Sequence, residues 1–239
     1  MIPPFFADGF DLTQALPGRW SGSAPAGAAS NTVAVSQAAK LGTSASLWGL
    51  QVTLQDIAPR NQTYVYASPS QGFNNETTLR GSFFIDPQGI NITGLNSFQM
   101  IDFLDTTGAG GHVHLIFLLQ QDPNTFNYHL NAWYWNQTLN SGAGNWAFAG
   151  GGFFALKNAA WHNNRIDFVW NNGNPGHLAM WRTLYTNGAP DPSGTIQIFS
   201  NDLPGMGGAV INYVFAGMFA SQDPGTSGVL NLDEFAFSR

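Results

Sequence analysis

Apolar and polar residues alternate along almost every long segment of this chain, and turn residues interrupt the alternation at short intervals. The final segment, 229–238, keeps the alternation nearly to the last residue. A period of two places successive side chains on opposite faces of a β-strand, whereas an amphipathic helix needs a period of 3.6. The pattern therefore predicts strands along most of the chain, and only 36–42 favours a short helix.

The turn residues divide the alternating segments into about fourteen predicted strands. We expect these strands near residues 5–10, 31–36, 47–55, 62–67, 77–86, 97–105, 112–120, 126–135, 146–156, 165–171, 177–185, 194–200, 209–219 and 229–238. Turns are expected at 86–89 (DPQG) and 107–111 (TGAGG). This organisation predicts an all-β fold, a two-sheet antiparallel sandwich. Residues 21–30 (SGSAPAGAAS) are interpreted as a loop within one domain, 1–239, because the segment before them is too short to fold alone.

The composition excludes several classes of function. Only 9% of the residues are charged, the net charge is −6, and Lys plus Arg number 8, so nucleic acid is not an expected partner. The absence of cysteine excludes disulfide scaffolds and thiol catalysis. No apolar run approaches the roughly 18 residues that span a bilayer. An uncharged polar surface is typical of extracellular or cell-surface proteins that meet glycans.

Several motifs carry a resemblance to a known family. They are Phe6-Ala7-Asp8-Gly9-Phe10 with Trp20 after it, the segment 79–87 ending in Asp-Pro, the hairpin 164–170 with 176–181, and the tail 223–228 with Leu232-Asp233-Glu234-Phe235. The chain resembles the bacterial extracellular concanavalin A-like (laminin G-like) β-sandwich domains of lectins and glucanases. The resemblance implies a jelly-roll sandwich. It does not imply one function, because that superfamily includes lectins, hydrolases, lyases and scaffolds.

Four of the predicted strands each present a polar or aromatic face. Aromatic rings that stack on sugars, beside planar hydrogen-bonding groups, are what glycan binding requires. We therefore predict carbohydrate binding on the concave face of the sandwich, and the alternative is an ordinary solvent-facing sheet. The predicted binding residues are Trp133, Trp135, Arg80, His114, His129, Asn131 and Asp167.

A catalytic function can be judged by whether the chain contains the residues that each reaction requires. A retaining glycosidase requires two close carboxyl groups, but the chain has only two glutamates, and the Glu-x-Asp-x-x-Glu strand of related hydrolases is missing. A lyase of this fold would use an Arg, a Gln-x-His strand, a Tyr and a Lys-Ala-Gly-x-Tyr segment. Arg80 and His112-Val113-His114 match this set only in part, and the last segment is not found. We assign no catalytic residue and predict a non-catalytic domain for surface attachment, with lyase or hydrolase activity as an alternative.

Metal binding and self-assembly are further possibilities. The resemblance implies a structural Ca²⁺ held by Asp8 and Asp233 on the terminal strands, and the alternative is that both acids accept turn hydrogen bonds. His112 and His114 are interpreted as surface histidines, since no third ligand is evident. The apolar extension Met1-Ile2-Pro3-Pro4-Phe5-Phe6 predicts a homo-polymer, such as a filament or surface layer, unless it covers its own core.

Overall fold

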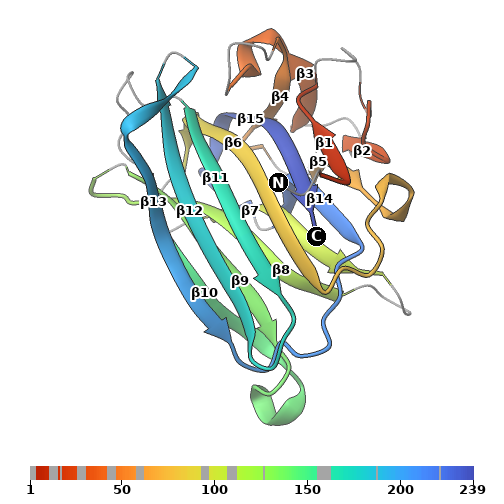
Figure 1. Ribbon diagram of the computed structural model, residues 1–239. Coiled ribbons are helices and arrows are strands. Elements are labelled where there is room, and N and C mark those ends of the chain that lie inside the picture. Colours follow the sequence, from red (N-terminus) through yellow and green to blue (C-terminus); the bar gives the residue numbers. More distant parts are fainter. Residues whose placement is uncertain are drawn as a thin grey trace.

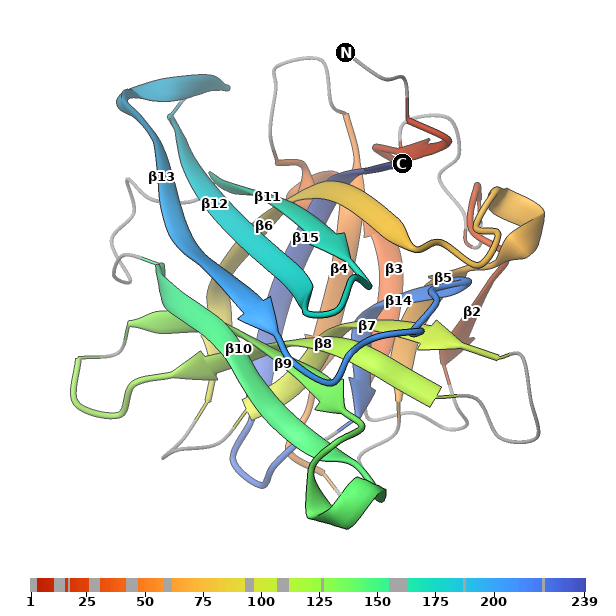
Figure 2. The ribbon, with the colours of Figure 1, turned by 60° about the horizontal axis from the view of Figure 1, so that its bottom comes forward.

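The computed structural model describes residues 4–10, 16, 18–25, 31–41, 47–57, 62–92, 97–106, 112–125, 127–154, 163–186, 188–220 and 222–239. Two antiparallel β-sheets face each other in these ranges, which confirms the predicted all-β jelly-roll sandwich (Figures 1 and 2). The helices described there are three short 3₁₀ turns at Gln37–Ala39, Pro69–Gln71 and Asn140–Gly142. None of them is long and apolar enough to cross a membrane.

The first sheet, sheet A, contains eight strands. Their order is β13 (Ala189–Leu203), β12 (Gly176–Thr186), β11 (Asn163–Asn171), β6 (Thr78–Asn91), β15 (Ser227–Ser238), β4 (Gly49–Leu54) and β3 (Thr32–Ser36), and β1 (Phe6–Asp8) also pairs with β15. The alternating tail of the chain therefore forms an interior strand of the sheet. The two ends of the chain meet there, because Phe6 lies opposite Phe237.

The second sheet, sheet B, contains seven strands. Their order is β10 (Asn145–Phe154), β9 (Tyr128–Asn136), β8 (His112–Gln121), β7 (Ser97–Asp105), β14 (Tyr213–Ala220), β5 (Thr63–Ala67) and β2 (Gly22–Pro25). Figure 2 shows β10 to β7 side by side below the strands of sheet A. Sheet B consequently has one face against the core and one face turned outward.

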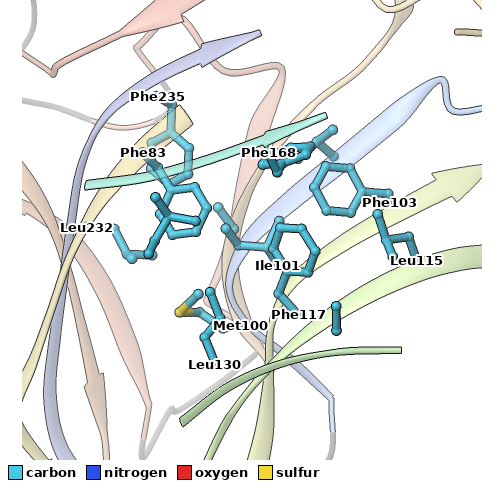
Figure 3. Packing of buried hydrophobic residues seen from close by; sticks show 14 of the residues in the cluster. Phe83, Met100, Ile101, Phe103, Leu115, Phe117, Leu130, Phe168, Leu232 and Phe235 are labelled. Carbon is cyan, nitrogen blue, oxygen red and sulfur yellow. The ribbon is translucent and has the colours of Figure 1, made fainter. Parts of the chain in front are cut away.

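The core fills the space between the two sheets (Figure 3). Phe168 of sheet A contacts Phe103 and Phe117 of sheet B, with ring centroids 5.4 and 5.2 Å apart and planes nearly perpendicular. All three side chains are at most 1% exposed. Burying a side chain of this size contributes about 1.5–3 kcal/mol, so these inward rows hold the sheets together.

Three local predictions differ from the structure. Gly22–Pro25, expected to be loop, forms strand β2 against β5, although its small residues give no alternating signal. The turn expected at 86–89 does not form, because β6 continues to Asn91 with a register shift against β15 between Val229 and Asn231. A bulge leaves a residue without a ladder partner, which accommodates a proline inside a strand. The expected helix at 36–42 is one 3₁₀ turn, and the expected turn at 107–111 lies outside the described residues.

The N-terminal extension packs on the protein itself over the part that is described. The backbone N–H of Phe5 donates to the carbonyl of Phe237 at 2.9 Å. Phe6 is 5% exposed and lies between Trp20 and Phe237. These two apolar side chains therefore cover their own core, which is the alternative to the predicted assembly role. Met1, Ile2 and Pro3 lie outside the described residues.

The C-terminal residue is held by an ion pair. The guanidinium of Arg239 donates to both carboxylate oxygens of Glu76, at 2.8 and 2.9 Å, and stacks 4.6 Å above the ring of Phe5. Glu76 is 4% exposed, so losing Arg239 leaves a buried carboxylate that still accepts from the N–H of Asn74 at 2.8 Å but has lost its counter-charge. We expect Arg239→Ala to lower the free energy of unfolding by about 2–3 kcal/mol, measured by urea denaturation. Lys40→Gln, at an exposed surface position, is the control, and an unchanged Arg239→Ala midpoint would contradict the prediction.

Candidate active site on the outer face of sheet B

Strand β9 separates its side chains between the two faces of sheet B as the alternation predicts. Tyr128, Leu130, Ala132 and Tyr134 belong to the core cluster. The intervening side chains are half-buried on the outer face: His129, Asn131, Trp133 and Trp135. The outer face therefore carries four of the predicted sugar-binding residues on one strand.

A row of directly paired residues crosses the outer face over six strands. It runs Phe148 (β10), Trp133 (β9), Ile116 (β8), Asp102 (β7), Phe215 (β14) and Tyr66 (β5). Residues directly opposite each other in an antiparallel pair share a face. Asp102 is thus the one carboxyl group in a row that is otherwise aromatic or aliphatic.

Aromatic rings gather on both sides of this central position. On β5 and β14 the ring of Phe215 lies 4.9 Å from Tyr64 and 5.5 Å from Tyr66. Gly22 on β2 is required here, since a Cβ atom would meet the Tyr66 ring at 2.7 Å. The rings on β9 and β10 pair as Trp133 with Phe148 at 5.4 Å and Trp135 with Trp146 at 5.6 Å. We call these groups the tyrosine wall and the tryptophan wall.

The strands between the two walls carry buried side chains on the same face, and we call these side chains the floor. Asp102 is 0% exposed, Ile116 4%, His114 7% and Leu104 8%, although the apolar Ile116 and Leu104 do not belong to the hydrophobic core between the sheets. Side chains on the outward face of a two-layer sandwich normally meet water. Their burial shows that the neighbouring side chains shield the centre of the face.

The Asp102 carboxyl group is buried without compensation. Neither carboxylate oxygen has a hydrogen-bond partner among the described residues. Burial raises the pKa of Asp102 well above its ordinary value, since a charge is poorly solvated there. The protonated form is favoured, and a protonated carboxyl can donate a hydrogen bond to an anion.

His114 is the second buried ionisable residue of the floor. Both ring nitrogens are buried and lack a hydrogen-bond partner among the described residues. Burial lowers the pKa of His114, the charge of Asp105 acts in the opposite direction, and His112 lowers it further. The ring of His112 stacks 6.2 Å from that of His114 and lies 6.5 Å from Trp135. A neutral imidazole can accept a proton, so the floor contains an acid and a base whose pKa values are shifted in opposite directions.

The structure does not gather all of the predicted binding residues. Trp133, Trp135, His114, His129 and Asn131 share the outer face of sheet B. The other two residues of the set, Arg80 on β6 and Asp167 on β11, belong to sheet A and line a hollow on its outer face. The single binding site predicted from the sequence is therefore divided between opposite faces of the sandwich.

The sequence prediction did not include Asp102, at the centre of this face, or Tyr213, which lies opposite Leu104 on the same face. One signal was present in the sequence: β14 reads Tyr213-Val214-Phe215-Ala216-Gly217-Met218-Phe219, which retains the Ala-Gly of the expected Lys-Ala-Gly-x-Tyr segment. Phenylalanine stands at both the Lys and the Tyr positions. Residues 215–219 therefore lack the ammonium and phenol groups of that segment, and the ionisable side chain opposite Phe215 is Asp102.

Asp8 and Asp233 are engaged in local hydrogen bonds. The Asp8 carboxylate accepts from the N–H of Phe10 at 2.8 Å. The Asp233 carboxylate accepts from the N–H groups of Leu41 at 2.9 Å and Glu234 at 2.8 Å. No group of three or more His, Cys, Asp or Glu that could hold a metal occurs among the described residues. The Ca²⁺ site implied by the resemblance stays a prediction.

Comparison with known proteins identifies relatives in structure but not in sequence. No protein-family model and no curated protein matches the chain. Among solved structures it is similar to the marine PL-14 alginate lyase from Aplysia kurodai, with a TM-score of 0.58, 10% identity and 98% of both chains covered. It is also similar to the alginate lyase Aly36B in complex with alginate trisaccharide, with a TM-score of 0.51, 10% identity, and 80% of this chain and 81% of that chain covered.

These neighbours correct the function predicted from the sequence. The coarse part of the resemblance, a β-sandwich of a carbohydrate-related kind, agrees with them. The prediction of a non-catalytic attachment domain is contradicted, because the structural neighbours are polysaccharide lyases. At 10% identity the similarity itself shows only the fold, so an activity has to be argued from the residues of this chain.

Proposed function

We propose that the protein is a polysaccharide lyase that binds an acidic polysaccharide along the outer face of sheet B. The observation that carries the proposal is the burial of Asp102 and His114 between two aromatic walls, with pKa values shifted in opposite directions. Environments that separate the pKa values of neighbouring groups are typical of acid–base catalysis. The alginate lyases that share the fold support the same reaction class.

The proposed reaction is a β-elimination. His114 takes the proton from the sugar carbon next to the carboxylate, and the bond from the adjacent carbon to the glycosidic oxygen breaks as a carbon–carbon double bond forms. Protonated Asp102 donates a hydrogen bond to the substrate carboxylate, where negative charge develops. The leaving oxygen takes a proton from the hydroxyl of Tyr213, which lies opposite Leu104 on the same face. The proposal requires the side chains that cover Asp102 and His114 to move aside for the substrate, because both residues are buried.

The tryptophan wall positions the sugar chain. Trp133 and Trp135 are two residues apart on one strand, about 7 Å, so each ring can stack on a separate sugar residue. We expect Trp133→Ala to raise the KM for an acidic polysaccharide about tenfold with little change in kcat, because stacking acts on the ground state and the transition state alike. Steady-state kinetics measure this. Ile196→Ala, an exposed apolar residue on β13, is the control, and an unchanged KM in Trp133→Ala would contradict the role.

The proposal is tested with a panel of polysaccharides. Polymannuronate, polyguluronate, glucuronan, pectate and hyaluronan are incubated with the protein, and the ultraviolet absorbance of unsaturated products is followed. Cellulose and starch fragments lack the acidic carbon–hydrogen bond and serve as controls. Absorbance growth on an acidic polymer that requires His114 supports the proposal. A flat trace on every acidic polymer would refute it.

Two sequence predictions belong with this proposal. We propose an extracellular or cell-surface location, since the uncharged polar composition suits contact with extracellular polysaccharides. We also retain a structural Ca²⁺ beside Asp8 and Asp233 as a proposal, to be tested by the shift of the melting temperature on chelation.

A further inference from the structure

A hollow of about 290 Å³ lies on the outer face of sheet A, on the opposite side of the sandwich from the aromatic walls. It is lined by residues of four adjacent strands. A row of directly paired residues forms its centre: Trp181 (β12), Asp167 (β11), Ser82 (β6) and Ala236 (β15). Its volume is near the lower limit of small-molecule sites, about 300 Å³. It can therefore hold a sugar residue but not a long segment of polymer.

Two arginines line this hollow, and only one of them is neutralised by a carboxylate. Arg165 donates to one carboxylate oxygen of Asp167 at 2.8 and 3.1 Å, which fixes both side chains. Arg80 is exposed at the rim, between Val169 and Ser238 in register, and makes no ion pair with the described part of the chain. In a protein of net charge −6, an arginine without a carboxylate partner in a hollow is a local attraction for an anion.

The remaining lining suits a sugar. The half-buried ring of Trp181 offers an aromatic surface, and Asp167 and Ser82 offer an acceptor and a hydroxyl. A guanidinium beside an aromatic ring and hydrogen-bonding side chains matches a pyranose that carries a carboxylate. An isolated inorganic anion would use Arg80 but would leave Trp181 without a role.

We propose that this hollow is a second saccharide site, which binds one uronate residue of an acidic polysaccharide. Arg80 binds the carboxylate, Trp181 stacks on the ring, and Asp167 and Ser82 bind hydroxyl groups. The nature of the ligand rests on the proposed function, because it is the acidic polymer assigned to the lyase face. The site itself rests on sheet A alone. It would hold a distant part of the same polymer while the outer face of sheet B cleaves another.

The test counts binding sites with the His114→Gln variant, which does not consume its ligand. Calorimetric titration with short mannuronate or guluronate oligosaccharides is expected to give two equivalents per chain. Adding Arg80→Gln or Trp181→Ala should remove one equivalent or weaken it at least tenfold, whereas adding Lys40→Gln should leave both. Cello-oligosaccharides of equal length test whether binding requires the carboxylate of the ligand. Inorganic phosphate tests whether any anion binds in the hollow.

The outcomes separate this proposal from the proposed function. A stoichiometry that does not depend on Arg80 would overturn the second site, whether or not the wild-type protein cleaves polymer. Tight binding of phosphate with no saccharide binding would also overturn it. Loss of one equivalent on Arg80→Gln would support it, even if the activity panel were negative, because in that case only the lyase assignment fails.

Discussion

Replacing His114 by Gln is expected to lower kcat on the best acidic polysaccharide about 10³-fold, because general-base catalysis contributes about 10²–10⁴-fold. Both kcat and kcat/KM should fall by the same factor, since the imidazole accepts the proton in the transition state and does not contribute to binding of the ground state. Initial rates of unsaturated-product formation measure the effect. The fold should persist, because the His114 ring makes no hydrogen bond among the described residues.

The matched control for this prediction is His177→Gln. His177 lies on β12 in sheet A, where its ring nitrogens contact Asp202 at 3.2 Å and Ser200 at 3.0 Å. It is therefore a histidine on the opposite sheet, and its loss should leave kcat unchanged. Equal activity of the two variants would remove His114 from the mechanism.

The pH dependence of kcat/KM is an independent test of the role of His114 as the base. The base must be neutral, and burial lowers the pKa of His114 below its ordinary 6.5. The acid limb of kcat/KM should consequently lie below pH 6.5, and activity should persist into mildly acidic solution. An acid limb above this value, or one that survives in His114→Gln, would assign the titration to another group.

Replacing Asp102 by Asn is expected to have opposite effects on activity and stability. We expect kcat to fall, because the Asn amide is a weaker hydrogen-bond donor to a developing negative charge than the protonated carboxyl group. The free energy of unfolding should rise by about 1–3 kcal/mol near neutral pH, because an uncompensated buried acid is replaced by a neutral group of the same shape. Activity assays and urea denaturation of the same preparation measure both changes.

The stability gain should depend on pH in a defined direction. The pKa of Asp102 is raised in the folded protein, so the folded state holds its proton more tightly than the unfolded state. Its stabilising contribution is complete below the ordinary value of 3.8 and is lost as the pH rises through the folded pKa. The difference between Asp102→Asn and wild type should therefore be small near pH 3 and grow as the pH rises.

Asp122 provides a control of opposite sign. Its pKa is lowered, chiefly by the backbone N–H groups of Asn124 and Thr125. Its carboxylate therefore stabilises the fold above pH 3.8 and ceases to do so as the pH falls through the folded pKa. Asp122→Asn should lower stability at neutral pH. A similar loss of stability in Asp102→Asn would show that Asp102 is a structural carboxylate and would contradict its role as the proposed acid.

The sequence predicts the face of each strand better than the sheet to which the strand belongs. Period two correctly placed His129 and Trp133 on one side of β9, because alternation is a property of the backbone. It also grouped Arg80 and Asp167 with Trp133, which the structure places on different sheets. Strand adjacency depends on tertiary pairing between distant segments, and no pattern within one strand encodes it.

Asp102 could not be predicted from the sequence for a related reason. In an alternating strand a carboxylate indicates a solvent-facing position, and only its neighbours on β8 and β14 reveal that it is buried. Those neighbours, Ile116 and Phe215, come from segments far apart in the chain. Buried ionisable groups of this kind depart from the sequence pattern, and such departures are typical of functional sites.

The most direct test of the central claim is to digest the best acidic polysaccharide in water enriched with heavy oxygen and to analyse the products by mass spectrometry. Elimination breaks the glycosidic bond without adding water. The lyase account therefore predicts unsaturated oligosaccharides that carry no heavy oxygen, and a loss of these products in His114→Gln. Saturated products that carry the label would show a hydrolase, and intact polymer across the whole acidic panel would show that the outer face of sheet B does not catalyse this reaction.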